Sequence, residues 1–246
     1  MKPLFKSLMN RQMSSGFWAV VPAAGIGERM QSDRPKQYLQ LEDKLVIEHT
    51  LQRLASHPEI KGIVIAVAQE DGWWPTVSID VSCPLYVVNG GKQRSYSVLK
   101  ALDKLSTLVN DDPWVLVHDA ARPCIRQEDI NRLLSMLSKH DVGGLLGIPV
   151  NDTVKRTGDD NVILETIERQ NLWRASTPQM FRLVLLKSAL ETSMEQNITV
   201  TDEASAIEFA GFEPVMVEGH SDNIKITVST DLALAQLFMQ QQRGEC

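Results

Sequence analysis

The chain has 246 residues, 43% of them hydrophobic, which is enough to bury a substantial core within one α/β domain. Its formal net charge of −6 excludes nucleic acid as the main partner, because binding a phosphate backbone requires a basic surface. Cys83, Cys124 and Cys246 form no C-x-x-C pair and are odd in number, which favours a reducing compartment and hence a cytoplasmic location. No segment is apolar over the length of a membrane span, so no membrane partner is expected.

Residues 1–16 are predicted to form a disordered leader. They include Lys2, Lys6 and Arg11 but lack the continuous apolar stretch of a signal peptide. Residues 17–246 are predicted to form a single domain.

From residue 17 onward, short β-branched apolar runs alternate with stretches of helical period, a pattern typical of a sheet with helices on both faces. The predicted strands are residues 17–21, 62–68, 85–88, 114–118 and 142–148. Apolar residues at helical spacing form two further faces, Val98, Ala101, Leu102 and Leu105, and Ile130, Leu133, Leu134 and Leu137. The predicted fold class is α/β, with a Rossmann-like, mostly parallel sheet.

Residues 150–178 interrupt this alternation. A polar turn at 157–161 separates two extended-looking runs, which predicts an inserted β-hairpin arm. The alternation then resumes with a helix over 201–210, a strand over 214–218 and a closing helix over 229–241, whose N-cap is Ser229 or Thr230.

The segment P-A-A-G-I-G-E-R-M at residues 22–30 directly follows the first predicted strand. Its small residues let the backbone approach a ligand closely, and the N–H groups of a following helix would attract phosphate. By itself, a tight strand-to-helix connection explains the segment equally well. Met30 stands where a dinucleotide fingerprint needs a small residue, and no Walker A ending is present. The cations Arg29, Arg34 and Lys36, which follow closely, favour a triphosphate as the ligand.

This loop, together with R-P-K-Q-Y at 34–38, resembles the nucleotide loop of the 2-C-methyl-D-erythritol 4-phosphate cytidylyltransferases of non-mevalonate isoprenoid synthesis. Further motifs of that family follow in order: G-G-K-Q-R-S-Y-S-V at 90–98, V-H-D-A-A-R-P at 117–123, D-T-V-K-R at 152–156, S-T-P-Q at 176–179, T-D-E-A-S at 201–205 and D-N-I-K-I-T at 222–227. Seven motifs in the family's order are far more specific than any one of them.

The resemblance implies transfer of CMP from CTP to 2-C-methyl-D-erythritol 4-phosphate, with release of pyrophosphate. CTP would be held by Ala23, Ala24, Gly25, Gly27, Gly91, Arg94, Ser97 and Ala120. The transition state would be stabilised by Arg29 and Lys36, and the acceptor phosphate would be positioned by Arg169 and Lys225. The acceptor pocket would be lined by Asp119, Arg122, Thr153, Thr177 and Thr201. Mg²⁺ would be held mainly by the CTP phosphates, and the arm would form a homodimer by exchange between subunits.

Several of these residues also have plain structural explanations. Asp119 could cap a loop, Thr201 could be a helix N-cap, and Arg169 could form a surface ion pair with a neighbouring glutamate. Lys92 replaces an acidic residue often found in the family, which leaves open whether its side chain contacts the nucleotide.

Two other functions remain as alternatives. Ribitol 5-phosphate cytidylyltransferases share the loop, but the H-D-A-A-R-P and D-E-A-S motifs favour the methylerythritol enzymes. The second alternative is a non-catalytic nucleotide-binding regulatory module, which would not need both Lys36 and Lys225. A nicotinamide dehydrogenase is disfavoured by Met30.

Overall fold

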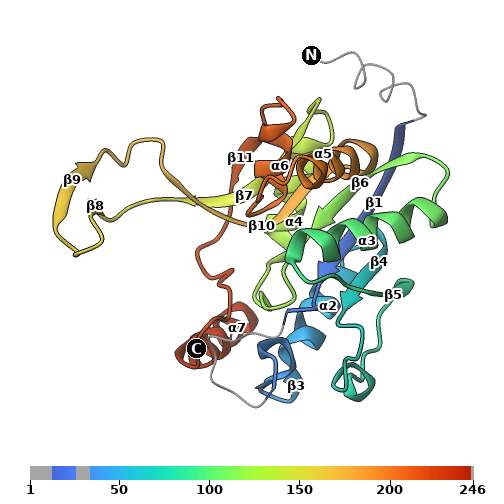
Figure 1. The fold of residues 1–246 in the computed structure, drawn as a ribbon. Coiled ribbons are helices and arrows are strands. Elements are labelled where there is room, and N and C mark those ends of the chain that lie inside the picture. The colour runs from blue at the N-terminus through green and yellow to red at the C-terminus, as the bar shows by residue number, and fades with distance from the viewer. Residues whose placement is uncertain (1–12, 26–33, 245–246) are drawn as a thin grey trace.

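A computed structural model of the chain describes residues 13–25 and 34–244. Its centre is a seven-stranded sheet with the order β11-β7-β10-β6-β1-β4-β5 (Figure 1). The strands are β1 (Met13–Pro22), β4 (Ile60–Val67), β5 (Leu85–Asn89), β6 (Asp112–Val117), β7 (Gly143–Pro149), β10 (Trp173–Arg182) and β11 (Val215–Glu218). Neighbouring strands are parallel except where β10 pairs with β6 and β7. The predicted α/β fold with a mostly parallel sheet is confirmed.

Helices cover both faces of this sheet. They are α2 (Val46–Ala55), α3 (Arg94–Leu108), α4 (Gln127–Leu137), α5 (Leu183–Glu195) and α6 (Glu203–Phe209). Successive strand residues point to opposite faces, so Val21 packs with α2 and α4, whereas Val20 packs with α3, α5 and α6. The two predicted apolar faces, on α3 and α4, are buried in these cores as expected.

A third, smaller core closes one end of the molecule. Helix α7 (Thr230–Arg243) packs through Ala235 and Met239 against Leu41, Val46 and Ile226. Here lie the short strands β2 (Gln40–Leu41) and β3 (Lys44–Leu45) and the 3-10 helix η2 (Lys36–Tyr38). This packing brings the loop before α7 beside the segment that follows the glycine-rich loop, although the two are about 190 residues apart in sequence.

The arm is shorter than predicted. Strands β8 (Val154–Thr157) and β9 (Ile163–Ile167) form a separate two-stranded sheet that extends away from the body (Figure 1). Residues from Trp173 onward already belong to β10, so the predicted boundary at 178 is wrong. The physical reason is that the chain returns from the arm directly alongside β7, and a hairpin connection makes the returning strand antiparallel to the outgoing one.

The predicted leader also extends too far. Strand β1 begins at Met13, whose backbone position pairs with Asp112 of β6, so the first strand starts four residues earlier than predicted. Residues 1–12 lie outside the part of the chain that the structure describes. Within residues 13–25 and 34–244, no helix is both long and apolar enough to cross a membrane.

Candidate active site

A cavity of about 620 Å³ opens where β1, β5 and β6 end at their carboxyl termini. Strands β4 and β6 lie on opposite sides of β1, so the chain reverses its direction across the sheet at this point. Open α/β sheets bind ligands at such a position, because the loops after neighbouring strands diverge there. Ten of the predicted site residues line the cavity, namely Ala23, Ala24, Gly25, Lys36, Gly91, Arg94, Ser97, Asp119, Ala120 and Lys225.

The start of the glycine-rich loop is held in place by hydrogen bonds on both sides. Ala23 N donates to Ala66 O at 2.7 Å, which extends the pairing of β1 with β4. The buried Gln37 side chain donates through Nε2 to Ala23 O at 2.7 Å and to Gly25 O at 3.0 Å. Gln37 was not predicted as a site residue, although it belongs to the R-P-K-Q-Y motif.

The Gly90-Gly91 turn forms the opposite wall. Gly90 N donates to Val67 O at 2.6 Å, and Gly91 N donates to the buried Ser97 Oγ at 3.0 Å. A side chain at Gly90 would collide with Ala24, so glycine is needed for this close approach of the two loops. The wall continues into the first turn of α3, whose free N–H groups suit an anionic ligand.

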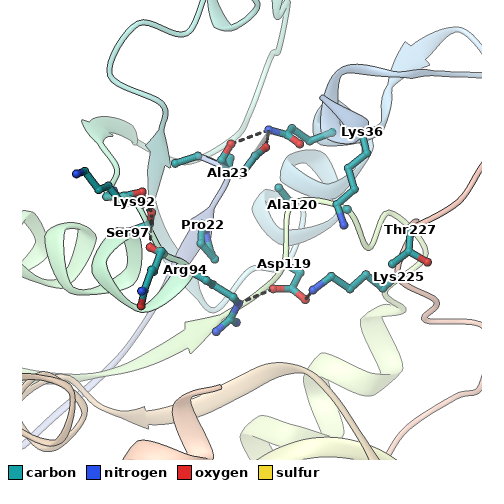
Figure 2. A pocket seen from close by; sticks show the side chains of 16 residues that line it. Pro22, Ala23, Lys36, Lys92, Arg94, Ser97, Asp119, Ala120, Lys225 and Thr227 are labelled. Atoms are coloured by element: carbon teal, nitrogen blue, oxygen red, sulfur yellow. Dashed lines mark hydrogen bonds and ion pairs between the residues drawn. The ribbon is translucent and has the colours of Figure 1, made fainter. Parts of the chain in front are cut away.

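Asp119 is the charged centre of the cavity. Its Oδ1 accepts from Arg94 Nε at 2.9 Å, and its Oδ2 lies 2.9 Å from Lys225 Nζ (Figure 2). The same Oδ2 lies 3.5 Å from Arg122 Nε. Burial by itself would raise the pKa of the Asp119 carboxyl, but Arg94, Lys225 and Arg122 together hold it well below its usual range. Asp119 is therefore an ionised anchor for cations and a poor base.

Arg94 joins Asp119 to a second carboxylate. Its Nη1 and Nη2 donate to the two oxygens of Glu203 at 2.6 and 3.0 Å, and Glu203 is 1% exposed. This forked pairing holds the guanidinium plane in one orientation. Glu203 lies in the T-D-E-A-S motif but was not predicted as a site residue, because nothing local indicates contact with a residue 109 positions earlier.

Thr177 and His118 lie behind Asp119. Asp119 N donates to Thr177 Oγ1 at 3.1 Å, and that oxygen lies 3.0 Å from His118 Nδ1. The other ring nitrogen, Nε2, lies 3.1 Å from Arg122 O. Burial lowers the pKa of His118 to about 4, so the ring is neutral at physiological pH. A consistent arrangement has Nε2–H donating to the carbonyl and the Thr177 hydroxyl donating to Nδ1.

Other predicted acceptor residues are not gathered at this cavity. Thr153 and Arg169 are exposed on the arm, and Glu165 pairs with Arg156 at 2.6 Å. Thr201 is exposed, and the N-cap of α6 is Asp202, so the N-cap explanation for Thr201 is wrong. The carboxylate of Asp202 accepts from Ser205 N at 3.0 Å and so caps the helix.

Two further predicted site residues, Gly27 and Arg29, lie outside the described residues. Lys92 lines the cavity, but Figure 2 shows its side chain pointing away from Lys36 and Lys225.

The chain was compared with known protein families and structures. The model of the 2-C-methyl-D-erythritol 4-phosphate cytidylyltransferase family matches residues 17–241. The chain belongs to this family.

Individual cytidylyltransferases agree with that assignment. The chain is 53% identical over 224 residues to the enzyme of that name from Hahella chejuensis, covering 91% of this chain and 93% of the relative. It is 49% identical over 230 residues to the one from Pseudomonas syringae pv. tomato, covering 93% and 96%. The crystal structure of the Francisella tularensis cytidylyltransferase superposes with a TM-score of 0.78 at 35% identity, covering 91% of this chain and all of that one.

Proposed function

We propose that this cavity transfers CMP from CTP to 2-C-methyl-D-erythritol 4-phosphate. The observation that carries the proposal is the convergence of Lys36 and Lys225 on one cavity whose walls are the two glycine-rich turns (Figure 2). A glycine-rich wall accommodates the nucleotide backbone, and two lysines from distant segments suit a ligand with many negative charges. Membership of the cytidylyltransferase family specifies the nucleotide and the acceptor.

The chemistry proposed is a direct in-line displacement. An oxygen of the acceptor phosphate attacks the α-phosphorus of CTP, the new P–O bond forms, and the bond to the β-phosphate oxygen breaks to release pyrophosphate. The attacking oxygen is already an anion, so no general base is needed, which fits an Asp119 carboxylate whose pKa is held low. The main requirement is positive charge around the reacting phosphates, which Lys36 and Lys225 supply.

The acidic groups at the cavity do not form a complete metal site. Among the described residues no three His, Cys, Asp or Glu side chains are grouped to hold an ion, and Asp119 already faces three cations. This arrangement fits Mg²⁺ held mainly by triphosphate oxygens and water, and Asp119 is the one carboxylate among the described residues that line the cavity. When bound, the ion neutralises charge on the triphosphate, while Lys36 and Lys225 orient the phosphates from the protein side.

The test of the activity is release of pyrophosphate from CTP with each of two acceptors. We expect kcat/KM for 2-C-methyl-D-erythritol 4-phosphate to exceed that for ribitol 5-phosphate by at least about tenfold, since a site built to pair with particular hydroxyls rejects a mismatched acceptor. Comparable values would remove the acceptor assignment. CTP binding without pyrophosphate release would favour a regulatory module instead.

We further propose that the arm completes the acceptor pocket of a second subunit in a homodimer. The arm leaves Val162, Ile163 and Leu164 56–65% exposed, and an isolated two-stranded hairpin is only marginally stable in water. A second copy of the chain is the simplest cover for these apolar residues. In such a dimer, Arg169 and Thr153 would serve the partner's site, which accounts for their distance from the cavity of their own chain.

Mixing two inactive variants tests this arrangement. Lys36→Ala and Arg169→Ala chains are unfolded together in equal amounts and refolded. If Arg169 acts in the partner's site, a mixed dimer has one intact site and one site that lacks both groups. Random pairing makes about half of the dimers mixed, so about a quarter of the wild-type activity should return. If Arg169 serves its own chain, mixing should restore nothing.

We also propose that the protein is located in the cytoplasm. Cys83 and Cys124 are both free thiols, as is usual in a reducing compartment.

A further inference from the structure

The loop between β4 and β5, residues 68–84, contacts the segment 34–38 that contains Lys36. We propose that Asp71 and Trp73 of this loop are positioning residues that hold Lys36 toward the reacting phosphates. The inference rests on the proposed function, because it assigns a role to groups around the same lysine. Neither residue lines the cavity or belongs to the seven family motifs.

Asp71 makes the first contact. Its Oδ2 accepts from the Tyr38 hydroxyl at 2.7 Å, and its Oδ1 accepts from the backbone N–H groups of Trp73 and Trp74, both at 3.0 Å. One oxygen therefore holds η2, while the other orders the turn that presents Trp73. Tyr38 is fully buried, and a hydrogen bond from a buried hydroxyl to a carboxylate is stronger than one between neutral groups.

Trp73 makes the second contact. The guanidinium carbon of Arg34 lies 4.7 Å from the centroid of the Trp73 ring, which is the geometry of a cation–π contact. Arg34 precedes Lys36 by two residues, so this contact holds the chain on the N-terminal side of the lysine. Trp73 itself is half-buried against the main core.

Lys36 lies midway between these two anchors, two residues after Arg34 and two before Tyr38. Gln37 adds a third anchor through its hydrogen bonds to Ala23 O and Gly25 O. The segment is one short 3-10 turn, closed by Tyr38 N donating to Pro35 O at 2.9 Å. The contacts of Arg34, Gln37 and Tyr38 with other parts of the chain fix the backbone on both sides of Lys36. Small displacements of a catalytic group reduce rates strongly, so these anchors should matter for turnover.

The test is a double-mutant cycle between Tyr38→Phe and Lys36→Ala. Tyr38→Phe removes only the hydroxyl that binds Asp71, so the fold should survive. We expect kcat to fall about tenfold in the wild-type background, from loss of one charge-assisted hydrogen bond, with KM for the acceptor changed less than twofold. In the Lys36→Ala background the same change should alter kcat less than about twofold, because no lysine remains to be positioned.

A second pair of variants tests the aromatic ring of Trp73 while keeping an apolar side chain against the main core. Trp73→Leu should lower kcat several-fold, whereas Trp73→Phe keeps an aromatic face and should retain most of the activity. The matched control is Lys104→Ala, which removes a similar contact, 5.9 Å from the Tyr86 ring centroid, away from the cavity. That control should leave kcat unchanged.

The possible outcomes separate this inference from the proposed function. If the wild-type chain releases no pyrophosphate, the proposed function fails. If it does, but Tyr38→Phe lowers kcat equally in both backgrounds, the hydroxyl does not act through Lys36 and the inference is overturned. A Lys36→Ala variant with wild-type kcat would overturn it as well, since positioning that lysine would then have no consequence.

Discussion

The buried side chain of His118 should make the free energy of unfolding depend on pH, and the substitution His118→Asn should remove that dependence. His118 is fully buried, its Nε2 lies 3.1 Å from Arg122 O, and its Nδ1 faces the Thr177 hydroxyl at 3.0 Å. Protonation would place a charge in this enclosed site and would prevent Nδ1 from accepting the Thr177 hydrogen. Burial accordingly lowers the pKa of His118 from 6.5 to about 4.

The sign and size of the effect follow from linkage. The unfolded chain takes up the proton near pH 6.5, whereas the folded chain resists it until about pH 4. Between those values the unfolded state binds more protons, so lowering the pH destabilises the fold. For one such group, the free energy of unfolding should fall by about 2.5 kcal/mol between about pH 7.5 and pH 4.5.

The assay is urea denaturation of the wild type and of His118→Asn at both pH values and at one fixed protein concentration, followed by tryptophan fluorescence. The variant has an amide that does not titrate, so the wild type should lose about 2.5 kcal/mol more than the variant on acidification. Other titrating groups are common to both proteins and cancel in the comparison. An extra loss below about 1 kcal/mol would refute a buried, neutral His118.

Three further outcomes follow from the site. Lys36→Ala should keep the fold but lose ~10²–10³ in kcat, measured by pyrophosphate release, and a value within a few-fold of wild type would make Lys36 an ordinary surface charge. Glu203→Gln should lower the free energy of unfolding by about 2–3 kcal/mol in urea denaturation, because Arg94 then faces a neutral amide in a largely buried pair; a change below about 0.5 kcal/mol would contradict this. Burial raises the pKa of the Cys124 thiol to about 12, so this cysteine should resist alkylation by iodoacetamide near neutral pH until the protein is unfolded. Rapid labelling of native protein, read by mass spectrometry, would argue otherwise.

Part of the candidate site was predictable from the sequence, because several of the residues that line the cavity lie in short motifs at the ends of strands. The apolar periodicity marked β1, β4, β5, β6 and β7, and the loops directly after parallel strands must meet at one edge of the sheet. The described start of the glycine-rich loop and Asp119, each at the end of a predicted strand, line one cavity. Gly91 and Lys225 line it as well, but both were named only by resemblance to the family.

The sequence by itself determined the order of elements, which faces are apolar and where small residues allow a ligand to approach, because each depends on spacing within a few residues. Only the tertiary structure decided that β10 runs antiparallel between β6 and β7, and that Arg94 binds Glu203 across 109 positions. It also decided that Tyr38 meets Asp71. These contacts depend on how strands are ordered in the sheet and how loops pack over its edge, and burial then sets the charge states, as in the neutral ring of His118. Local spacing carries no information about either.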